Sequence, residues 1–239
     1  MAKFVPLTGC QKELWLSAKA ALSDYAETSI RGCYHIDAAL DPELLRQAIR
    51  CTLHFTPLPA ASLCQDEEEP CFMVGEPHEP DFRVLDAASQ PDSVAAADRM
   101  IDEFFEEPVE NPLIRYALVL TGPSTCIVAI KCSHVVLDGL AIFFHIAVIA
   151  NVYTALARGE TPNLGEPCPC DEAYIEDQAH CASPRFQKDM AFWQEHLARL
   201  PEKRLLRALP GRPDVLGESR HQKYVLSEKA SREAAATIA

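Results

Sequence analysis

The stretch Ser133–Gly139 contains the residue types of a proton-transfer site. The imidazole of His134 can accept a proton near neutral pH, which suits a general base acting on an amine or a hydroxyl. Asp138 and Gly139 follow at positions where they can shape the loop that holds the imidazole. The pattern His-x-x-x-Asp-Gly also arises by chance, in which case His134 is a buried histidine hydrogen-bonded to a backbone carbonyl. The sequence on both sides of the stretch is needed to decide between a general base and a buried structural histidine.

The sequence on both sides predicts that His134 lies at a strand-to-helix corner. Thr125–Cys132 is a nearly continuous apolar run, which is typical of an interior strand. Leu113–Leu120 precedes it across a short Gly-Pro turn, and the two runs together predict a β-hairpin. Leu140–Arg158 is apolar nearly all round, so we expect a largely buried helix that ends at Gly159. A histidine between an interior strand and a buried helix is held firmly.

The rest of the chain alternates between strand and helix patterns, which indicates the α/β class with a mixed sheet. Further strands are expected at Ser29–Ile36, Cys71–Val74, Phe82–Leu85 and Lys223–Leu226. Helices are expected at Thr8–Leu16, from Asp41 to Pro57 at the latest, at Pro184–Leu200, and from Ser227 to Ala239. One more helix is predicted by an apolar face that comprises Val94, Ala97, Ile101, Phe104 and Phe105.

The composition excludes several classes of partner. The 239 residues are 48% hydrophobic and 24% charged, which is ordinary for a globular protein. With 35 acidic against 22 basic residues the net charge is −13, and no basic patch is present to bind nucleic acid. The N-terminus lacks a secretion signal, and the longest apolar run, Leu140–Val152, is too short to span a bilayer, so no membrane association is expected.

The ten cysteines are expected to be reduced, which places the protein in the cytoplasm. Most are predicted to be core residues because they lie within apolar runs, among them Cys33, Cys51, Cys126 and Cys132. Cys132 closes an apolar strand, so we interpret it as inert rather than as a nucleophile. Cys168 and Cys170 form one close pair without a second, so no metal site is predicted.

Several short stretches occur in an order that is specific as a set. They are Leu7–Leu16 with Gln11 and Trp15, Phe104–Val109 with Asn111–Arg115, Ser133–Gly139, and Tyr174–Asp177 followed by Phe192–Leu197. In this order they resemble the signatures of the condensation domain of non-ribosomal peptide synthetases, in the chloramphenicol acetyltransferase-like superfamily. The ordered set covers most of the chain and is far more specific than the heptapeptide alone.

The resemblance implies an α/β fold, the mixed-sheet lobe of the chloramphenicol acetyltransferase-like fold with flanking helices. It implies that residues 1–239 form the N-terminal lobe, truncated before a similar C-terminal lobe, with the active site in a tunnel between them. The full domain would form an amide bond between acyl groups that donor and acceptor carrier proteins hold as phosphopantetheine thioesters. The isolated lobe is expected to be inactive, and the domain itself is expected to bind no cofactor and no metal.

The resemblance also gives roles to single residues. His134 is expected to position or deprotonate the amine that attacks the thioester. Asp138 is expected to pair with a basic residue and so fix the loop, and Gly139 to let the backbone approach the substrate or turn into the helix. Ser133 stands in place of the first histidine of the family's His-His-x-x-x-Asp-Gly motif, where it is expected to change packing more than chemistry. Leu53–Pro59 lacks the arginines of the matching family segment, so no brace from them to the active-site loop is expected.

Several functions stay open within this resemblance. Because Leu7 lies within ten residues of Met1, we expect the domain to begin its polypeptide. It would then be a starter condensation domain, which acylates the first amino acid and could take its acyl group from coenzyme A. A stand-alone acyltransferase and an epimerisation domain share the His-x-x-x-Asp-Gly corner. A module that only docks carrier proteins is the non-catalytic alternative, which Ser133 and the missing arginines favour.

Overall fold

The computed structural model describes residues 2–20, 29–64, 69–76, 79–107, 112–167, 169–199 and 227. The chain divides into two units, Met1–Lys188 and Asp189–Ala239. The first unit contains both sheets and the His134 corner, and the second contributes residues 189–198 of one helix, Arg199 and Ser227 to the described residues. The predicted strand Lys223–Leu226 and the helix expected after Ser227 lie outside the described residues.

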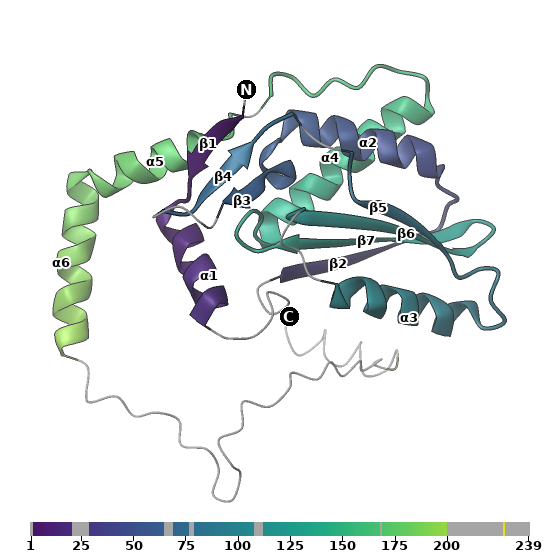
Figure 1. Ribbon diagram of the computed structural model, residues 1–239, viewed down its shortest axis with the longest axis horizontal. Coiled ribbons are helices and arrows are strands. Elements are labelled where there is room, and N and C mark those ends of the chain that lie inside the picture. The colour runs from purple at the N-terminus through teal and green to yellow at the C-terminus, as the bar shows by residue number, and fades with distance from the viewer. Residues whose placement is uncertain are drawn as a thin grey trace, which may run out of the picture. The chain divides into compact units, whose positions relative to one another are not determined.

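A four-stranded mixed sheet forms the centre of the first unit (Figure 1). Its order is β2-β7-β6-β5, with β2 at Ser29–Ile36, β5 at Phe82–Asp86, β6 at Ile114–Gly122 and β7 at Thr125–Ser133. β5 runs parallel to β6, and the other pairs are antiparallel. The α/β class with a mixed sheet is confirmed, and so are the hairpin and the interior position of β7, which has β2 on one side and β6 on the other.

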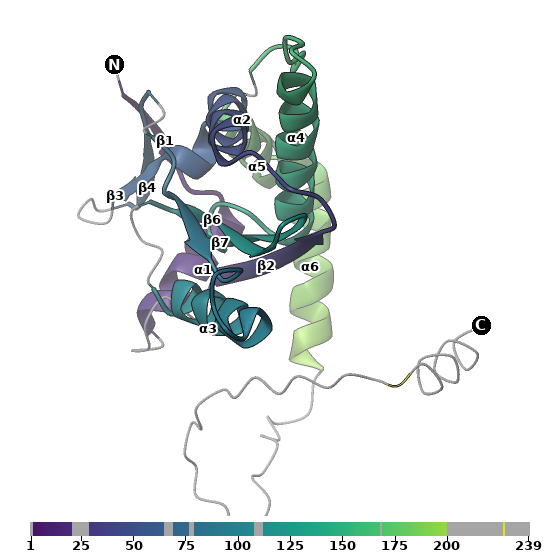
Figure 2. The ribbon, with the colours of Figure 1, turned by 90° about the vertical axis from the view of Figure 1, so that its right-hand side faces the viewer.

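Helices cover both faces of this sheet (Figures 1 and 2). α2 (Pro42–Phe55) and α4 (Gly139–Ala157) lie on one face, and α3 (Ser93–Glu106) lies on the other. Successive side chains of a strand point to opposite faces, so β6 serves both layers. Tyr116 and Leu118 point to one face and pack with α2 and α4. Ala117 and Val119 point to the other face and pack with α3. Burial on both faces explains why β6 and β7 are apolar along nearly their whole length.

Local sequence signals set the helix ends as predicted. Asp41 Oδ1 accepts hydrogen bonds from the backbone N–H groups of Glu43 and Leu44, at 2.8 and 3.1 Å, and Pro42 occupies the first helical position. Beyond α4, Gly159 has a φ of +71°, a left-handed conformation that glycine adopts without a steric penalty. Both signals were readable because each depends on residues within one turn of the helix end.

Among the described residues, two further α-helices that belong wholly to the first unit lie outside these layers. α1 (Gly9–Ala20) begins with a reciprocal cap, in which Thr8 Oγ1 accepts from the Gln11 N–H at 3.3 Å and Gln11 Oε1 accepts from the Thr8 N–H at 2.9 Å. Gln11 therefore has a local structural role. α5 (Glu172–Cys181) and α6 (Pro184–Ala198) come after α4 in the sequence. α5 was not predicted because it buries no side chain and so shows no apolar stripe.

A small antiparallel sheet of order β1-β4-β3 lies beside the His134 corner (Figure 1). Its strands are β1 (Lys3–Pro6), β4 (Cys71–Val74) and β3 (Ser62–Cys64). β4 was predicted because its four residues are all apolar, whereas β1 and β3 were missed because Lys3, Pro6 and Ser62 leave each only two consecutive apolar residues. The core face of this sheet forms one hydrophobic cluster with the residues next to His134, including Val5, Leu63, Phe72, Val74, Leu113, Val135 and Val136. The small sheet therefore supports the turn that carries His134.

Burial was predicted wrongly at several positions. α4 is not largely buried, because the exposed fractions are 66%, 60% and 58% for Leu140, Phe143 and Phe144. The buried stripe of α4 faces α2 and the sheet and comprises Ile142, His145, Ile149 and Val152. On α3 the other four residues of the expected apolar face pack toward the sheet, and Val94 alone does not, with 71% of its surface exposed. Cys33 is exposed because β2 is an edge strand.

The length of α4 also differs from the expectation based on its apolar run. The helix has 19 residues, and by length and composition alone it could cross a membrane, so the expectation that it is too short is wrong. A helix that packs on a protein core passes the same test, which makes a single instance weak support for a membrane span. In this fold the apolar stripe of α4 packs against α2 and the central sheet.

Candidate active site

The backbone at His134 forms a tight turn between β7 and α4. Ser133, the last residue of β7, accepts a hydrogen bond at its carbonyl oxygen from the Val136 N–H at 3.1 Å. The Ser133 N–H donates to the Leu113 carbonyl at 2.8 Å, and its Oγ accepts from the Val135 N–H at 3.4 Å. The Ser133 side chain is only 6% exposed, so it holds the turn together from inside.

His134 is half-buried, and its Nδ1 atom is buried with no hydrogen-bond partner in the part of the chain that the structure describes. A buried polar atom without a partner is uncommon in folded proteins and requires an explanation. Val135 and Val136 are 2% and 8% exposed and anchor the turn in the cluster beneath the small sheet. Since Nδ1 is enclosed, Nε2 is the ring nitrogen left to exchange a proton with a substrate. Nδ1 is thus not satisfied by a carbonyl of the described residues.

Asp138 and Gly139 form the start of α4. Asp138 Oδ1 accepts from the N–H groups of Leu140 and Ala141, at 3.0 and 2.7 Å, and so caps the helix. The Asp138 side chain makes no ion pair within the described ranges, and Leu53–Pro59 offers no arginine to it. A Cβ atom added at Gly139 would meet no heavy atom within 4 Å, and its φ is not left-handed. Neither backbone geometry nor packing within this chain therefore requires glycine there.

Several of the stretches that resemble the family's signatures meet around this turn within the first unit. The Gly9 N–H at the start of α1 donates to Asp177 Oδ2 of α5 at 3.1 Å. Trp15 and Tyr174 pack against the cluster that contains Leu113, Val135 and Val136. Segments far apart in the sequence thus share one small core next to His134. The stretch Phe192–Leu197 lies on α6 in the second unit.

A buried lysine lies two residues before Ser133 on β7. Lys131 is 0% exposed, and its Nζ donates to the carbonyl oxygens of Phe105, at 2.5 Å, and of Glu107. Its register partners are Arg31 on β2 and Arg115 on β6. Burial, and then the two arginines, lower the Lys131 pKa from 10.5 to about 8. Sequence reasoning missed this contact; a charged residue inside an apolar interior strand signals that its amino group needs buried partners, but not which ones they are.

Acidic side chains balance this row of cations. The Glu107 carboxylate accepts hydrogen bonds from Arg115 at 2.7 Å and from Arg83 at 2.8 Å. The bond from Arg83 holds the Glu107 pKa below its usual value of 4.5. Arg115 also donates to Asp81 at 2.6 Å. The end of α3 is therefore tied to β5, β6 and β7 near the end of the sheet that carries His134.

His145 and Tyr116 form a buried pair between α4 and β6. Tyr116 Oη and His145 Nε2 lie 2.7 Å apart, and the two residues are 1% and 6% exposed. Burial lowers the His145 pKa from 6.5 to about 4 and raises the Tyr116 pKa well above 10.0. His145 is therefore a neutral core residue near pH 7.

We expect acid to destabilise the protein through His145. Because its folded pKa of about 4 lies below the unfolded value of 6.5, the unfolded state binds the proton first. This contribution to stability is complete above pH 6.5 and is lost progressively as the pH falls from 6.5 through 4, and the loss by pH 4.5 is about 2–3 kcal/mol. Urea unfolding near pH 7 and near pH 4.5 should show a smaller acid loss for His145→Gln than for the wild type. Tyr116→Phe, which leaves His145 buried, should keep the wild-type acid loss, and equal losses in wild type and His145→Gln would contradict the assignment.

Cys132 adjoins the turn but lacks the properties of a nucleophile. It is 0% exposed, and burial raises its pKa to about 12, so the thiol stays protonated near neutral pH. The prediction that Cys132 is inert agrees with this environment. Among the described residues no group of three or more His, Cys, Asp or Glu side chains could hold a metal ion, and Cys168 lies outside them.

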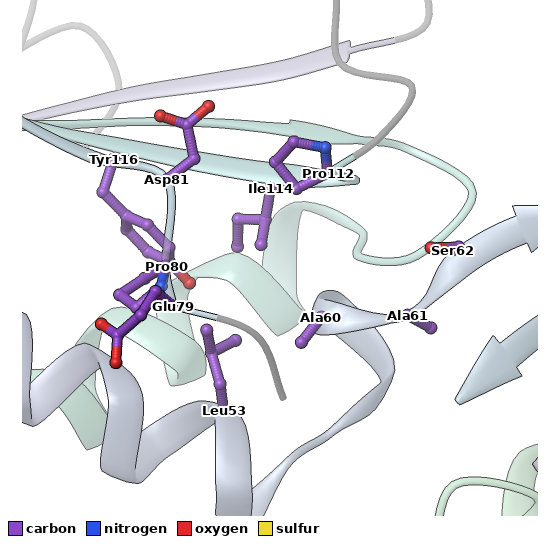
Figure 3. A pocket seen from close by; sticks show the side chains of 10 residues that line it. All are labelled: Leu53, Ala60, Ala61, Ser62, Glu79, Pro80, Asp81, Pro112, Ile114 and Tyr116. Atoms are coloured by element: carbon purple, nitrogen blue, oxygen red, sulfur yellow. The ribbon is translucent and has the colours of Figure 1, made fainter. Parts of the chain in front are cut away.

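A cavity of about 300 Å³ lies between the end of α2, η2 (Leu58–Ala60) and the start of β6. Figure 3 shows the side chains that line it, among them Leu53, Ile114 and Tyr116. Ile114 pairs with Cys132 on β7, so the cavity lies beside the strand ends that lead to His134. Its volume is at the lower end of small-molecule sites, and its mainly apolar lining suits a short hydrocarbon group.

A sequence model of the condensation domain matches residues 1–234. The chain belongs to the condensation-domain family. It is 26% identical over 208 residues to surfactin synthase subunit 1 of Bacillus subtilis (strain 168), a match that covers 83% of this chain and 6% of the relative. It is 25% identical over 207 residues to enterobactin synthase component F of Shigella flexneri, with 84% and 16% covered. The relatives of this condensation domain thus include synthetases of a siderophore.

Solved structures show the same fold. A crystal structure of a variant of the starter condensation domain of rhizomide synthetase RzmA is similar with a TM-score of 0.74 at 23% identity, over 87% of this chain and 48% of that one. The predicted chloramphenicol acetyltransferase-like fold is confirmed. This condensation domain spans about half of that structure and a small part of the curated relatives. Those relatives are non-ribosomal peptide synthetases, whose condensation domains form amide bonds and work with phosphopantetheine-bearing carrier proteins.

Proposed function

We propose that this chain is the N-terminal lobe of a condensation domain that joins two groups held as phosphopantetheine thioesters on a donor and an acceptor carrier protein. Residues 1–239 supply one wall of the active site, and a C-terminal lobe supplies the other. The domain binds no cofactor and no metal of its own. It acts in the cytoplasm, on neither nucleic acid nor membrane.

The enclosed Nδ1 of His134 at a well-packed turn is the observation that carries this proposal. The acceptor amine attacks the thioester carbonyl carbon, a C–N bond forms, and the C–S bond then breaks to release the phosphopantetheine thiol. The amine loses one proton and the leaving sulfur gains one. Because Nδ1 of His134 is not accessible, Nε2 is the nitrogen that acts. It can accept the proton that the amine loses, or hold the amine in line for attack.

Gly139 and Asp138 shape the approach to His134 rather than take part in the chemistry. Space in front of Gly139 is open, so the missing side chain there leaves room for a group outside this chain to approach the backbone. We assign that group to the phosphopantetheine arm. Asp138 fixes the direction of α4 through its cap. Ser133 is buried in the turn, so its presence does not favour the alternative of a module that only docks carrier proteins.

We further propose that the domain is of the starter type and accepts an acyl group from coenzyme A as well as from a carrier protein. The support is the similarity to the rhizomide starter domain, whose structure is a complex with C8-CoA and Leu-SNAC. A stand-alone acyltransferase and an epimerisation domain share the corner, but they would give different products from the same substrates.

Reconstitution tests this function. The complete two-lobe domain, incubated with an acyl coenzyme A and an aminoacyl carrier protein, should give an acyl-aminoacyl carrier protein, detected by intact-protein mass spectrometry. The isolated 239-residue chain should give none, because half of its active site is absent. Amide formation by the isolated chain would contradict the two-lobe arrangement. Inversion of the aminoacyl centre without acylation would establish the epimerisation alternative instead.

A further inference from the structure

Two cysteines lie directly opposite each other in the small sheet. In the antiparallel pair of β3 and β4, the register joins Cys64 to Cys71. Opposite residues in such a pair have Cα atoms about 4.5–5.5 Å apart, and disulfides join Cα atoms about 4.4–6.8 Å apart. Among the strand pairings that the structure describes, this is the one position where cysteine faces cysteine. The backbone therefore already has the spacing that a disulfide needs.

Both thiols lie on the outer face of this sheet. Leu63 and Phe72 are 8% and 1% exposed and point into the core, so the next residues along each strand point the other way. Cys64 and Cys71 are accordingly half-buried, and neither is in a disulfide in this structure. A small oxidant can reach half-buried thiols, in contrast to the fully buried Cys132.

We propose that Cys64 and Cys71 are a redox-active pair, which a small disulfide such as oxidised glutathione converts reversibly into a cross-strand disulfide. One cysteine thiolate attacks a sulfur of oxidised glutathione, forms a mixed disulfide and displaces one glutathione thiolate. The other cysteine thiolate then attacks the protein sulfur of the mixed disulfide and displaces the second glutathione. The two protons lost by the cysteines are gained by the two glutathione thiolates, so glutathione is reduced and the cysteine pair is oxidised.

The bond would affect the layer that supports His134. It would join β3 to β4, and the opposite face of β4 packs with the turn through Phe72 and Val74, in the cluster that contains Val135 and Val136. Oxidation would thus restrict the small sheet beneath the turn without touching the imidazole. The redox pair depends on strand register alone and does not rest on the function proposed above.

Mass spectrometry of the oxidised chain tests the pair. The reduced chain is incubated with oxidised glutathione under native conditions, and the remaining thiols are alkylated. Before alkylation we expect a product lighter by about 2 mass units, the two hydrogens lost in forming the bond, and after alkylation a product with two fewer alkyl groups than the reduced control. A glutamate-specific protease cuts between the cysteines, so a Cys64–Cys71 linkage should appear as two peptides joined by a bond that dithiothreitol breaks.

The variants Cys64→Ser and Cys71→Ser should each abolish this linkage. Cys51→Ser is the matched control, because Cys51 is also half-buried but lies on α2, and it should leave the linkage intact. Circular dichroism of each variant shows whether it is folded, and the wild-type linkage map stands independently of the variants. Alkylation of both wild-type thiols after oxidation, or a lasting glutathione adduct on either one without linkage, would overturn the proposal.

Discussion

Replacing His134 by alanine in the complete condensation domain should lower the rate of amide formation by about 10²–10⁴-fold, the usual contribution of a general base. The fold should be unaffected, because Nδ1 has no partner in the described residues that truncation would leave unsatisfied. The turn keeps its anchors, since Val135 and Val136 pack on their own account. Single-turnover assays by mass spectrometry measure the rate, and thermal melting checks the fold.

The matched control for this substitution is His35→Ala. His35 is an exposed histidine on β2 of the same unit, at the end of the strand away from the turn, where it pairs with Ile127. It should retain wild-type turnover and melting temperature. Wild-type turnover in His134→Ala would show that His134 neither acts as the base nor positions the amine. A rate loss accompanied by unfolding would instead assign His134 to stability.

Replacing Lys131 by alanine should lower the free energy of unfolding by about 2–4 kcal/mol. The truncation removes a buried aliphatic stem and leaves the Phe105 and Glu107 carbonyl groups without their donor. Relief of repulsion from Arg31 and Arg115 offsets part of the cost, since both arginines lower the Lys131 pKa. Urea unfolding of the chain measures the effect. A change below about 0.5 kcal/mol would show that the contact contributes nothing net.

Lys131→Met separates the two parts of this cost. Methionine refills the volume of the stem but donates no hydrogen bond, so recovery of stability in this variant measures the packing part. Because the folded pKa of Lys131, about 8, lies below 10.5, the unfolded state holds the proton longer as the pH rises. The stability of the wild type relative to Lys131→Met should therefore increase between pH 8 and pH 10.5. A difference that does not change with pH would exclude a shifted lysine.

The sequence predicted the His134 corner because its signals are local. An apolar run predicted β7, and the turn at 123–124 predicted the hairpin. The caps at Asp41 and Gly159 predicted two helix ends. Each depends on neighbours within a few residues, where steric and hydrogen-bonding preferences act directly. The cap made by Asp138 is a local feature of the same kind, although the expected partner of this side chain was a basic residue.

Contacts between distant segments were not predictable in the same way. Nothing local to Lys131 indicates that its amino group reaches the carbonyl of Phe105, 26 residues earlier, and nothing in α4 indicates that its apolar residues divide into a buried stripe and an exposed one. The bond from Gly9 to Asp177 spans 168 residues. Such contacts depend on how layers stack, which a single sequence encodes only through the fold as a whole.

The pairing of β2 with β7 also sets the order in which the chain can fold. β6 and β7 are neighbours in sequence and can form their hairpin within microseconds, but the partner of β2 begins at Thr125, far along the chain from Ile36. During synthesis β2 therefore leaves the ribosome roughly 5–20 s before β7 does. Throughout that interval the apolar side chains of β2 and its unpaired backbone are open to chaperones and to association with other nascent chains. The central sheet is therefore completed late in synthesis, once β7, the strand that leads to His134, has been made and can pair with β2.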